Sequence, residues 1–231
     1  MSEAYYLVPT QFFKNLSMAE SLFEVPKFRK GLNITPDWLW APKSFPIDID
    51  TGEDWTEEDM LVWKYIYSEF ESHLQSVCDF SGYDEKDLRH IWFHLQEDVW
   101  DPDDPSALQN DDIHKDIFEN MYKVINMQVY MGDTRTQEDE VLGTMFWEYV
   151  GDNPDKDLGS EFGEYVISHN PSVFELIGHA PYKKNTAIMY NPGYNGIWHS
   201  APTHEVLNEN NVAKITRKSI IARYCFNGQI Q

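Results

Sequence analysis

The chain has little cysteine and lacks any long run of apolar residues. Its two cysteines, Cys78 and Cys225, are isolated and form no C-x-x-C pair, so the usual spacing of a zinc-thiolate site or a redox dithiol is absent. We expect two free thiols in a reducing cytoplasm. No stretch of about 18 apolar residues is present to span a membrane, and the first residues lack the basic and apolar regions of a signal peptide. We therefore expect a cytoplasmic protein without a membrane span.

Basic residues are also scarce. The chain has 18 lysines and arginines against 39 aspartates and glutamates, which gives a formal net charge of −21 at pH 7. A surface this acidic repels the phosphates of nucleic acids and anionic lipids. The composition therefore argues against nucleic acid and membrane as partners and leaves a small molecule or a peptide as the substrate. The same excess of acid would also suit solubility in a salty setting.

Aromatic residues are abundant, with 8 tryptophans, 13 tyrosines and 13 phenylalanines among 231 residues. This composition is typical of a folded globular chain and not of a disordered one. The length suits one domain with a large core. We predict a single domain over residues 1–231, in which residues 1–87 form an N-terminal wrapping segment with a helix and residues 88–227 form the core.

One helix is predicted from residue 56 to about residue 75. Thr56 is a good N-cap, and Asp59 is placed to bond back to it. Trp55 and Met60 have the spacing of a hydrophobic staple across the helix start. The apolar residues that follow recur at roughly helical spacing: Leu61, Tyr65, Tyr67, Phe70 and Leu74. We expect this helix to pack on the outside of a sheet.

The chain from residue 88 onward has the pattern of short strands. Segments rich in β-branched and aromatic residues are 123–131, 141–150, 173–177, 185–190, 197–201 and 215–226. Residues 88–95 fit either a strand or a helix, whereas polar residues and turn formers predict loops at 97–112 and 151–160. Short strands at close spacing predict a sandwich or a barrel.

A His-x-Asp pair and one distant histidine have the residue types of a metal site. They are His114, Asp116 and His199. Residues two apart on an extended chain point to the same side, so His114 and Asp116 can face one metal ion. Two histidines and one carboxylate form the facial triad that holds Fe(II) and leaves positions open for oxygen chemistry. The ligated ion keeps one positive charge, which suits an anionic keto acid.

The motif is weak when it stands alone. The chain has 8 histidines and 39 acidic residues, so one such pair is expected by chance. Asp116 could then be a turn or helix cap, and His199 could be a hydrogen-bonded core histidine. The residues around the motif are needed to decide between these interpretations.

Six segments follow one another in an order that is known from a family of enzymes. They are residues 114–116, 123–130, 142–146, 185–192, 198–202 and 217–224. Together they resemble the Fe(II)/2-oxoglutarate-dependent dioxygenase superfamily, in particular its prolyl-hydroxylase-like and phytanoyl-hydroxylase-like branches. The resemblance covers about residues 88–227, while residues 1–87 match no family that we can name. It implies a mainly β fold with flanking helices and a double-stranded β-helix core, the jelly-roll arrangement also seen in cupins.

The resemblance implies the roles of the histidines. His114, Asp116 and His199 would be the ligands of Fe(II). His204 lies close enough to the distal histidine in sequence to be its fallback. Three further histidines are expected not to bind metal: His90, His94 and His179.

The resemblance also implies a site for the cosubstrate 2-oxoglutarate. Arg217 is expected to pair with its distal carboxylate through two hydrogen bonds, a geometry that arginine suits better than lysine. Ser219 shares the same strand face and is expected to add a hydroxyl, while Arg223, also on this face, is the alternative to Arg217, or else a surface arginine or a substrate contact. Further contacts are expected from Asn126, Gln128 and Tyr130, with Tyr130 preferred. The interval from His199 to Arg217 is long for the family.

The implied activity is that of a hydroxylase. The oxidative decarboxylation of 2-oxoglutarate, with Fe(II) and O2, would be coupled to hydroxylation of a small molecule or a peptide side chain. Asp116 favours hydroxylation over halogenation, because related halogenases have a small residue in its place. One alternative is a non-catalytic β-barrel binding protein. The other is a cupin-type metalloenzyme that does not use 2-oxoglutarate, although such an enzyme would usually have a histidine in place of Asp116.

Overall fold

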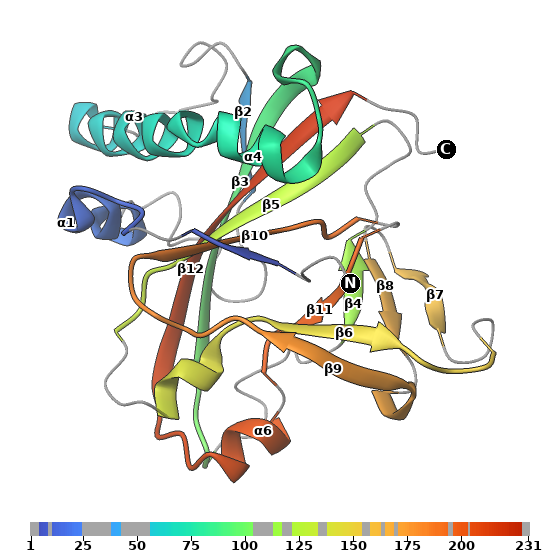
Figure 1. Cartoon of the computed structure of the whole chain (residues 1–231). Helices are drawn as coiled ribbons and strands as arrows, with labels where there is room; N and C mark the ends of the chain where they lie inside the picture. The colour runs from blue at the N-terminus through green and yellow to red at the C-terminus, as the bar shows by residue number, and fades with distance from the viewer. Residues whose placement is uncertain are drawn as a thin grey trace.

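The chain folds mainly into antiparallel β-sheet with a few helices, as the sequence predicts (Figure 1). The computed structural model describes residues 5–8, 11–24, 38–42, 56–103, 113–116, 122–133, 138–153, 158–162, 165–168, 171–193, 196–202 and 204–227. All statements below concern these residues. Trp55 and the side chain of Asp59, which belong to the predicted helix start, lie outside them.

The strands form two six-stranded sheets. In order across the first sheet these are β1 (Tyr6–Leu7), β10 (Thr186–Tyr190), β5 (Tyr122–Tyr130), β12 (Ile215–Asn227), β3 (Leu88–Trp100) and β2 (Trp38–Pro42). Across the second they are β7 (Leu158–Phe162), β8 (Tyr165–Ser168), β4 (His114–Asp116), β11 (Trp198–Ser200), β6 (Met145–Tyr149) and β9 (Phe174–His179). Every neighbouring pair is antiparallel.

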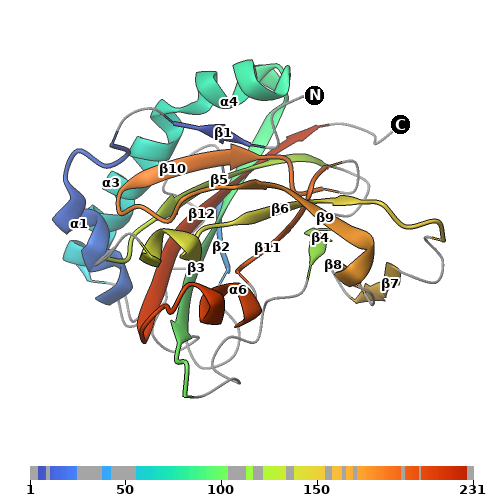
Figure 2. The same cartoon turned by 60° about the horizontal axis from the view of Figure 1, so that its bottom comes forward.

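The longer helices lie on the outer side of the first sheet, away from β6 and β9 (Figure 1, Figure 2). The α-helices are α1 (Leu16–Glu20), α3 (Glu57–Ser72), α4 (Leu74–Ser81) and α6 (His204–Glu209). The 3-10 turns are η1 (Ser21–Glu24), η2 (Glu85–Asp87), η3 (Glu138–Leu142) and η4 (Pro171–Val173). Among the described residues, no helix combines the length and the apolar character needed to cross a membrane.

The predicted helix begins as expected but ends differently. The backbone N–H of Met60 donates to the carbonyl of Thr56 at 3.1 Å, in agreement with a start at Thr56. At the other end the helix breaks around His73, whose N–H bonds to the carbonyl of Phe70. A second helix, α4, then runs to Gly82, which adopts the left-handed conformation (φ 71°) typical of glycine after a helix end.

Alternation along β12 separates two environments. Ile220, Ala222, Tyr224 and Phe226 belong to the apolar cluster under the helices. In that cluster the Phe93 ring lies 4.7 Å from the Trp63 ring and 5.2 Å from the Phe70 ring. The odd-numbered residues of β12 point to the opposite face, and the polar ones there, Arg217, Ser219 and Arg223, are also buried. The first sheet therefore has an apolar outer face and an inner face on which buried polar side chains stand among apolar ones.

Three predicted boundaries were wrong. β3 continues to Trp100 through the first residues of the predicted loop 97–112, because β12 is long enough to pair with it as far as Ile215. Glu97 is stabilised there by Lys218, whose Nζ lies 3.0 Å from its carboxylate. β7 likewise begins inside the predicted loop 151–160. Within the segment 141–150, the first residues belong to η3, and the strand begins only at Met145.

Replacing Phe93 with alanine tests the packing between helices and sheet. Phe93→Ala empties a buried site between two aromatic rings and should lower the free energy of unfolding by about 3–5 kcal/mol. Leu61→Ala, on the exposed face of α3, should change it by less than about 0.5 kcal/mol. Urea denaturation followed by circular dichroism measures both. A Phe93→Ala protein as stable as Leu61→Ala would contradict this packing.

Candidate metal centre

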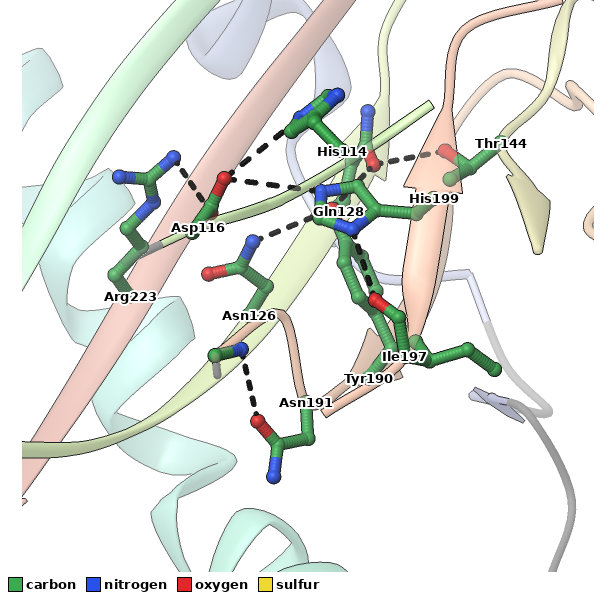
Figure 3. A network of polar contacts seen from close by, with 11 residues as sticks. His114, Asp116, Asn126, Gln128, Thr144, Tyr190, Asn191, Ile197, His199 and Arg223 are labelled. Atoms are coloured by element: carbon green, nitrogen blue, oxygen red, sulfur yellow. Dashed lines mark hydrogen bonds and ion pairs between the residues drawn. The ribbon is translucent and has the colours of Figure 1, made fainter. Parts of the chain in front are cut away.

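The pairing of β4 with β11 brings the three predicted ligands together. His114 lies directly opposite His199 across this pair of strands. Opposed residues of an antiparallel pair point to the same side, and Asp116, two residues further along β4, points there as well. One ligand atom from each of His114, Asp116 and His199 lies within 4.8 Å of the others. Figure 3 shows the three side chains converging from the two strands.

The three side chains present one carboxylate oxygen to two imidazoles. Oδ1 of Asp116 lies 3.7 Å from Nε2 of His114 and 3.9 Å from Nε2 of His199. Asp116 and His199 are buried, whereas the side chain of His114 is 21% exposed and marks the open side. Two nitrogens and one oxygen that converge from one side can hold a metal ion and leave its other positions open.

His199 has the protonation state that a metal ligand needs. Burial, followed by repulsion from His114, lowers its pKa to about 3, so the imidazole is neutral at physiological pH. Its Nδ1 lies 3.2 Å from the carbonyl oxygen of Ile197. A hydrogen on Nδ1 donates to that carbonyl and leaves the lone pair of Nε2 directed at Asp116.

The second oxygen of the carboxylate is bound by an arginine. Nη2 of Arg223 lies 3.0 Å from Oδ2 of Asp116, and Arg223 is only 4% exposed. Of the alternatives that the sequence left open for Arg223, that of a surface arginine is therefore wrong. The backbone N–H of Asp116 donates to the carbonyl of Pro192 at 2.9 Å, which ties the end of β4 to the loop that leads into β11.

A chain of buried polar groups continues from the metal ligands along β5. Nδ2 of Asn126 donates to the hydroxyl of Tyr190 at 3.2 Å. The hydroxyl of Thr144 donates to Oε1 of Gln128 at 3.0 Å, and Nε2 of Gln128 donates to Ser219 at 3.1 Å. These bonds satisfy polar side chains that would otherwise be costly to bury.

Tyr130 lies at the far end of this chain of polar groups. Its hydroxyl donates to the hydroxyl of Thr144 and accepts from the Thr144 backbone N–H, both at 2.9 Å. Burial raises the pKa of Tyr130 to about 12, against the opposing influence of the nearby Arg217 charge. The phenol is thus a hydrogen-bond donor at physiological pH.

Arg217 occupies a separate level of the interior from the metal ligands. Its Nε donates to the carbonyl of Leu142 at 2.7 Å, and the residue is buried. Arg217 and Arg223 are six residues apart on the same face of β12, a separation of roughly 20 Å along the strand. The structure therefore places one arginine against Asp116 and the other beside Tyr130.

Other histidines lie outside the cluster. Nε2 of His179 lies 3.1 Å from the carbonyl of Val141, and the ring of His90 is stacked on Trp92. The side chains of His94 and His204 fall outside the described residues. Among the side chains that the structure describes, His114, Asp116 and His199 form the one group of three potential ligands.

Two buried residues of the polar network were not singled out from the sequence. Thr144 and Tyr190 lie within the segments 142–146 and 185–192 of the family order, but neither carries a sequence signal of its own. Tyr190 closes β10 opposite Asn126, and its ring lies 5.0 Å from that of His199. Strand register, which the sequence does not give, is what brings these residues to the site.

Comparison with known proteins gives little help. No protein-family model and no curated protein matches the chain. Among solved structures it is similar to a prolyl hydroxylase from Trichoplax adhaerens in complex with a peptide fragment of the hypoxia inducible factor oxygen degradation domain. The similarity has 9% sequence identity and a TM-score of 0.49, and covers 98% of this chain and 84% of that one.

Acid should destabilise the metal-free protein through His199. As the pH falls below about 6.5 the unfolded histidine binds a proton, while native His199, with a pKa of about 3, does not. Stability that is fully present above pH 6.5 is therefore lost as the pH falls toward 3. Between pH 6.5 and 4.5 this loss is about 2–3 kcal/mol. In His199→Gln, the free energy of unfolding measured with urea should fall by about 2–3 kcal/mol less over this pH range than it does in the wild type. If the free energy of unfolding falls equally in both proteins, His199 is not held neutral.

Proposed function

We propose that this protein is an Fe(II)- and 2-oxoglutarate-dependent hydroxylase. The observation that carries the proposal is the convergence of His114, Asp116 and His199 on one point of a buried polar interior. The donor set fits Fe(II), because two neutral imidazoles and one carboxylate on one face are typical of non-haem iron oxygenases. Asp116 distinguishes this set from the mainly histidine sites of cupin-type metalloenzymes, which makes that alternative weaker.

We further propose that eight of the strands form a double-stranded β-helix within a single domain. The order of the sheets supports this. Strands β3, β5, β10 and β12 are adjacent in the first sheet, and β4, β6, β9 and β11 are adjacent in the second. Taken through these eight strands in sequence order, the chain changes sheet at every step except that from β6 to β9. Such winding of two four-stranded sheets is typical of jelly rolls, and in them the metal ligands lie between the sheets.

Arg217 is the residue that we propose for the distal carboxylate of 2-oxoglutarate. It is buried, its Nε donates to the carbonyl of Leu142, and its charge influences Tyr130. Arg223 is less suitable, because it already lies 3.0 Å from the Asp116 carboxylate. We propose that Tyr130 and Ser219 bind the same carboxylate, and that Gln128 and Asn126 line the space between it and the iron.

In this proposal the chain's residues bind, orient and exclude water. Iron and 2-oxoglutarate would together supply the O2-dependent oxidation of a substrate C–H bond. His199 is kept neutral and aimed by the Ile197 carbonyl, so it needs no proton loss before it binds metal. The ring of Tyr190 packs against His199 and Phe146, which keeps water from this side of the site. The substrate, a small molecule or a peptide side chain, would approach from the exposed side of His114.

Arg217→Met tests the cosubstrate site. Loss of one partner of a buried, hydrogen-bonded charge pair costs about 2 kcal/mol or more, so half-maximal succinate formation should need roughly 30-fold more 2-oxoglutarate. Iron affinity should be unchanged, because Arg217 lies roughly 20 Å along β12 from Arg223, the arginine beside Asp116. The matched control is Lys218→Met, which removes one positive charge from the next residue, on the other face of β12.

The measurement is succinate formed in the presence of Fe(II), O2 and varied 2-oxoglutarate. Lys218→Met should behave as the wild type. An Arg217→Met protein with the wild-type dependence on 2-oxoglutarate would reject Arg217 as the carboxylate partner. If the wild type forms no succinate at any concentration of 2-oxoglutarate, the protein does not decarboxylate 2-oxoglutarate without its specific substrate.

A further inference from the structure

We propose that Arg223 is a positioning residue that holds Asp116 as a one-oxygen metal ligand. The proposal rests on the metal site of the proposed function, but it does not depend on 2-oxoglutarate. It gives a role to the second arginine of β12, for which the sequence suggested an alternative to Arg217, a surface arginine or a substrate contact.

The two oxygens of Asp116 face different partners. Oδ2 lies 3.0 Å from Nη2 of Arg223, while Oδ1 is the oxygen that faces both imidazoles, at 3.7 and 3.9 Å. Because the guanidinium engages Oδ2, the carboxyl group is held with Oδ1 directed at the place where the two imidazoles meet. The rotation of the carboxyl group is thereby fixed before any metal binds. Figure 3 shows Asp116 between Arg223 on one side and the two histidines on the other.

The strand that carries Arg223 is firmly held. β12 is paired with β3 from Ile215 to Phe226 and with β5 from Ser219 to Asn227. Arg223 lies opposite Trp92 on β3 and Asn126 on β5. Asp116, in contrast, is the last residue of a three-residue strand. The arginine therefore ties the end of the short strand to a central strand of the other sheet.

Electrostatics alone predicts the opposite effect of Arg223 on metal binding. A buried positive charge next to the ligand carboxylate repels a cation, so its removal should tighten metal binding. A positioning role predicts weaker binding after removal, because groups that orient metal ligands typically contribute 10- to 100-fold in affinity. The sign of the change in affinity thus decides between the two, and it is independent of any catalytic assay.

The test is a Co²⁺ titration of the metal-free protein, followed by visible absorption. Arg223→Met should weaken Co²⁺ binding roughly 10- to 100-fold and alter the spectrum of the bound ion. Arg89→Met is the matched control, since it removes one positive charge from an exposed position on the neighbouring strand β3. Its affinity should stay within about twofold of the wild type, because exposed charges are well screened.

The outcomes separate this inference from the proposed function. Unchanged or tighter Co²⁺ binding by folded Arg223→Met would overturn the positioning role, even if the wild type binds one ion at the three ligands. Failure of the wild type itself to bind Co²⁺ would overturn the metal site and this inference with it. If Arg223→Met does not fold by circular dichroism, Arg223→Gln takes its place. Glutamine is uncharged and two atoms shorter than arginine, so its amide cannot take the place of Nη2 at Oδ2; affinity below the wild type therefore supports positioning, and equal or tighter affinity rejects it.

Discussion

The antiparallel pairing of β4 with β11 is the constraint on which the site depends. These strands have only three residues each, yet their register sets His114 directly opposite His199. A shift of that register by one residue would turn the histidines to opposite sides, because side chains alternate along a strand. The register is supported from outside the pair, by β6 on the far side of β11 and by β8 on the far side of β4. The site thus depends on the whole second sheet.

The interior of the protein buries charge in a way that its surface composition does not suggest. A chain with a net charge of −21 places two arginines inside, and one of them offsets the buried carboxylate of Asp116. Burial of an unpaired carboxylate is costly, so removal of its arginine partner would destabilise the folded protein. Between the two arginines, amide and hydroxyl groups bond to one another along β5. This polar interior is where the proposed iron ion and 2-oxoglutarate would bind.

Much of this arrangement could be predicted from the sequence, and the rest could not for a definite reason. Alternation along one strand is visible in the sequence, so the shared face of His114 and Asp116 and that of Arg217 and Ser219 were predictable. The partner of Arg223 was not predictable, because β12 and β4 belong to different sheets and the contact depends on how the two sheets face each other. The extension of β3 was hidden for a similar reason, since Glu97 is polar and becomes a strand residue only through its pairing with β12.

The central claim is that one iron ion and one 2-oxoglutarate bind together at the three ligands. Its most direct test is the anaerobic addition of Fe(II) and then 2-oxoglutarate to metal-free protein, with the visible spectrum recorded after each step. A weak charge-transfer band should develop on addition of the keto acid and should be absent in His114→Ala. Folded protein that binds iron but develops no band would contradict the use of 2-oxoglutarate and favour a cupin-type metalloenzyme. Folded protein that binds no iron would contradict the account as a whole and favour a non-catalytic barrel.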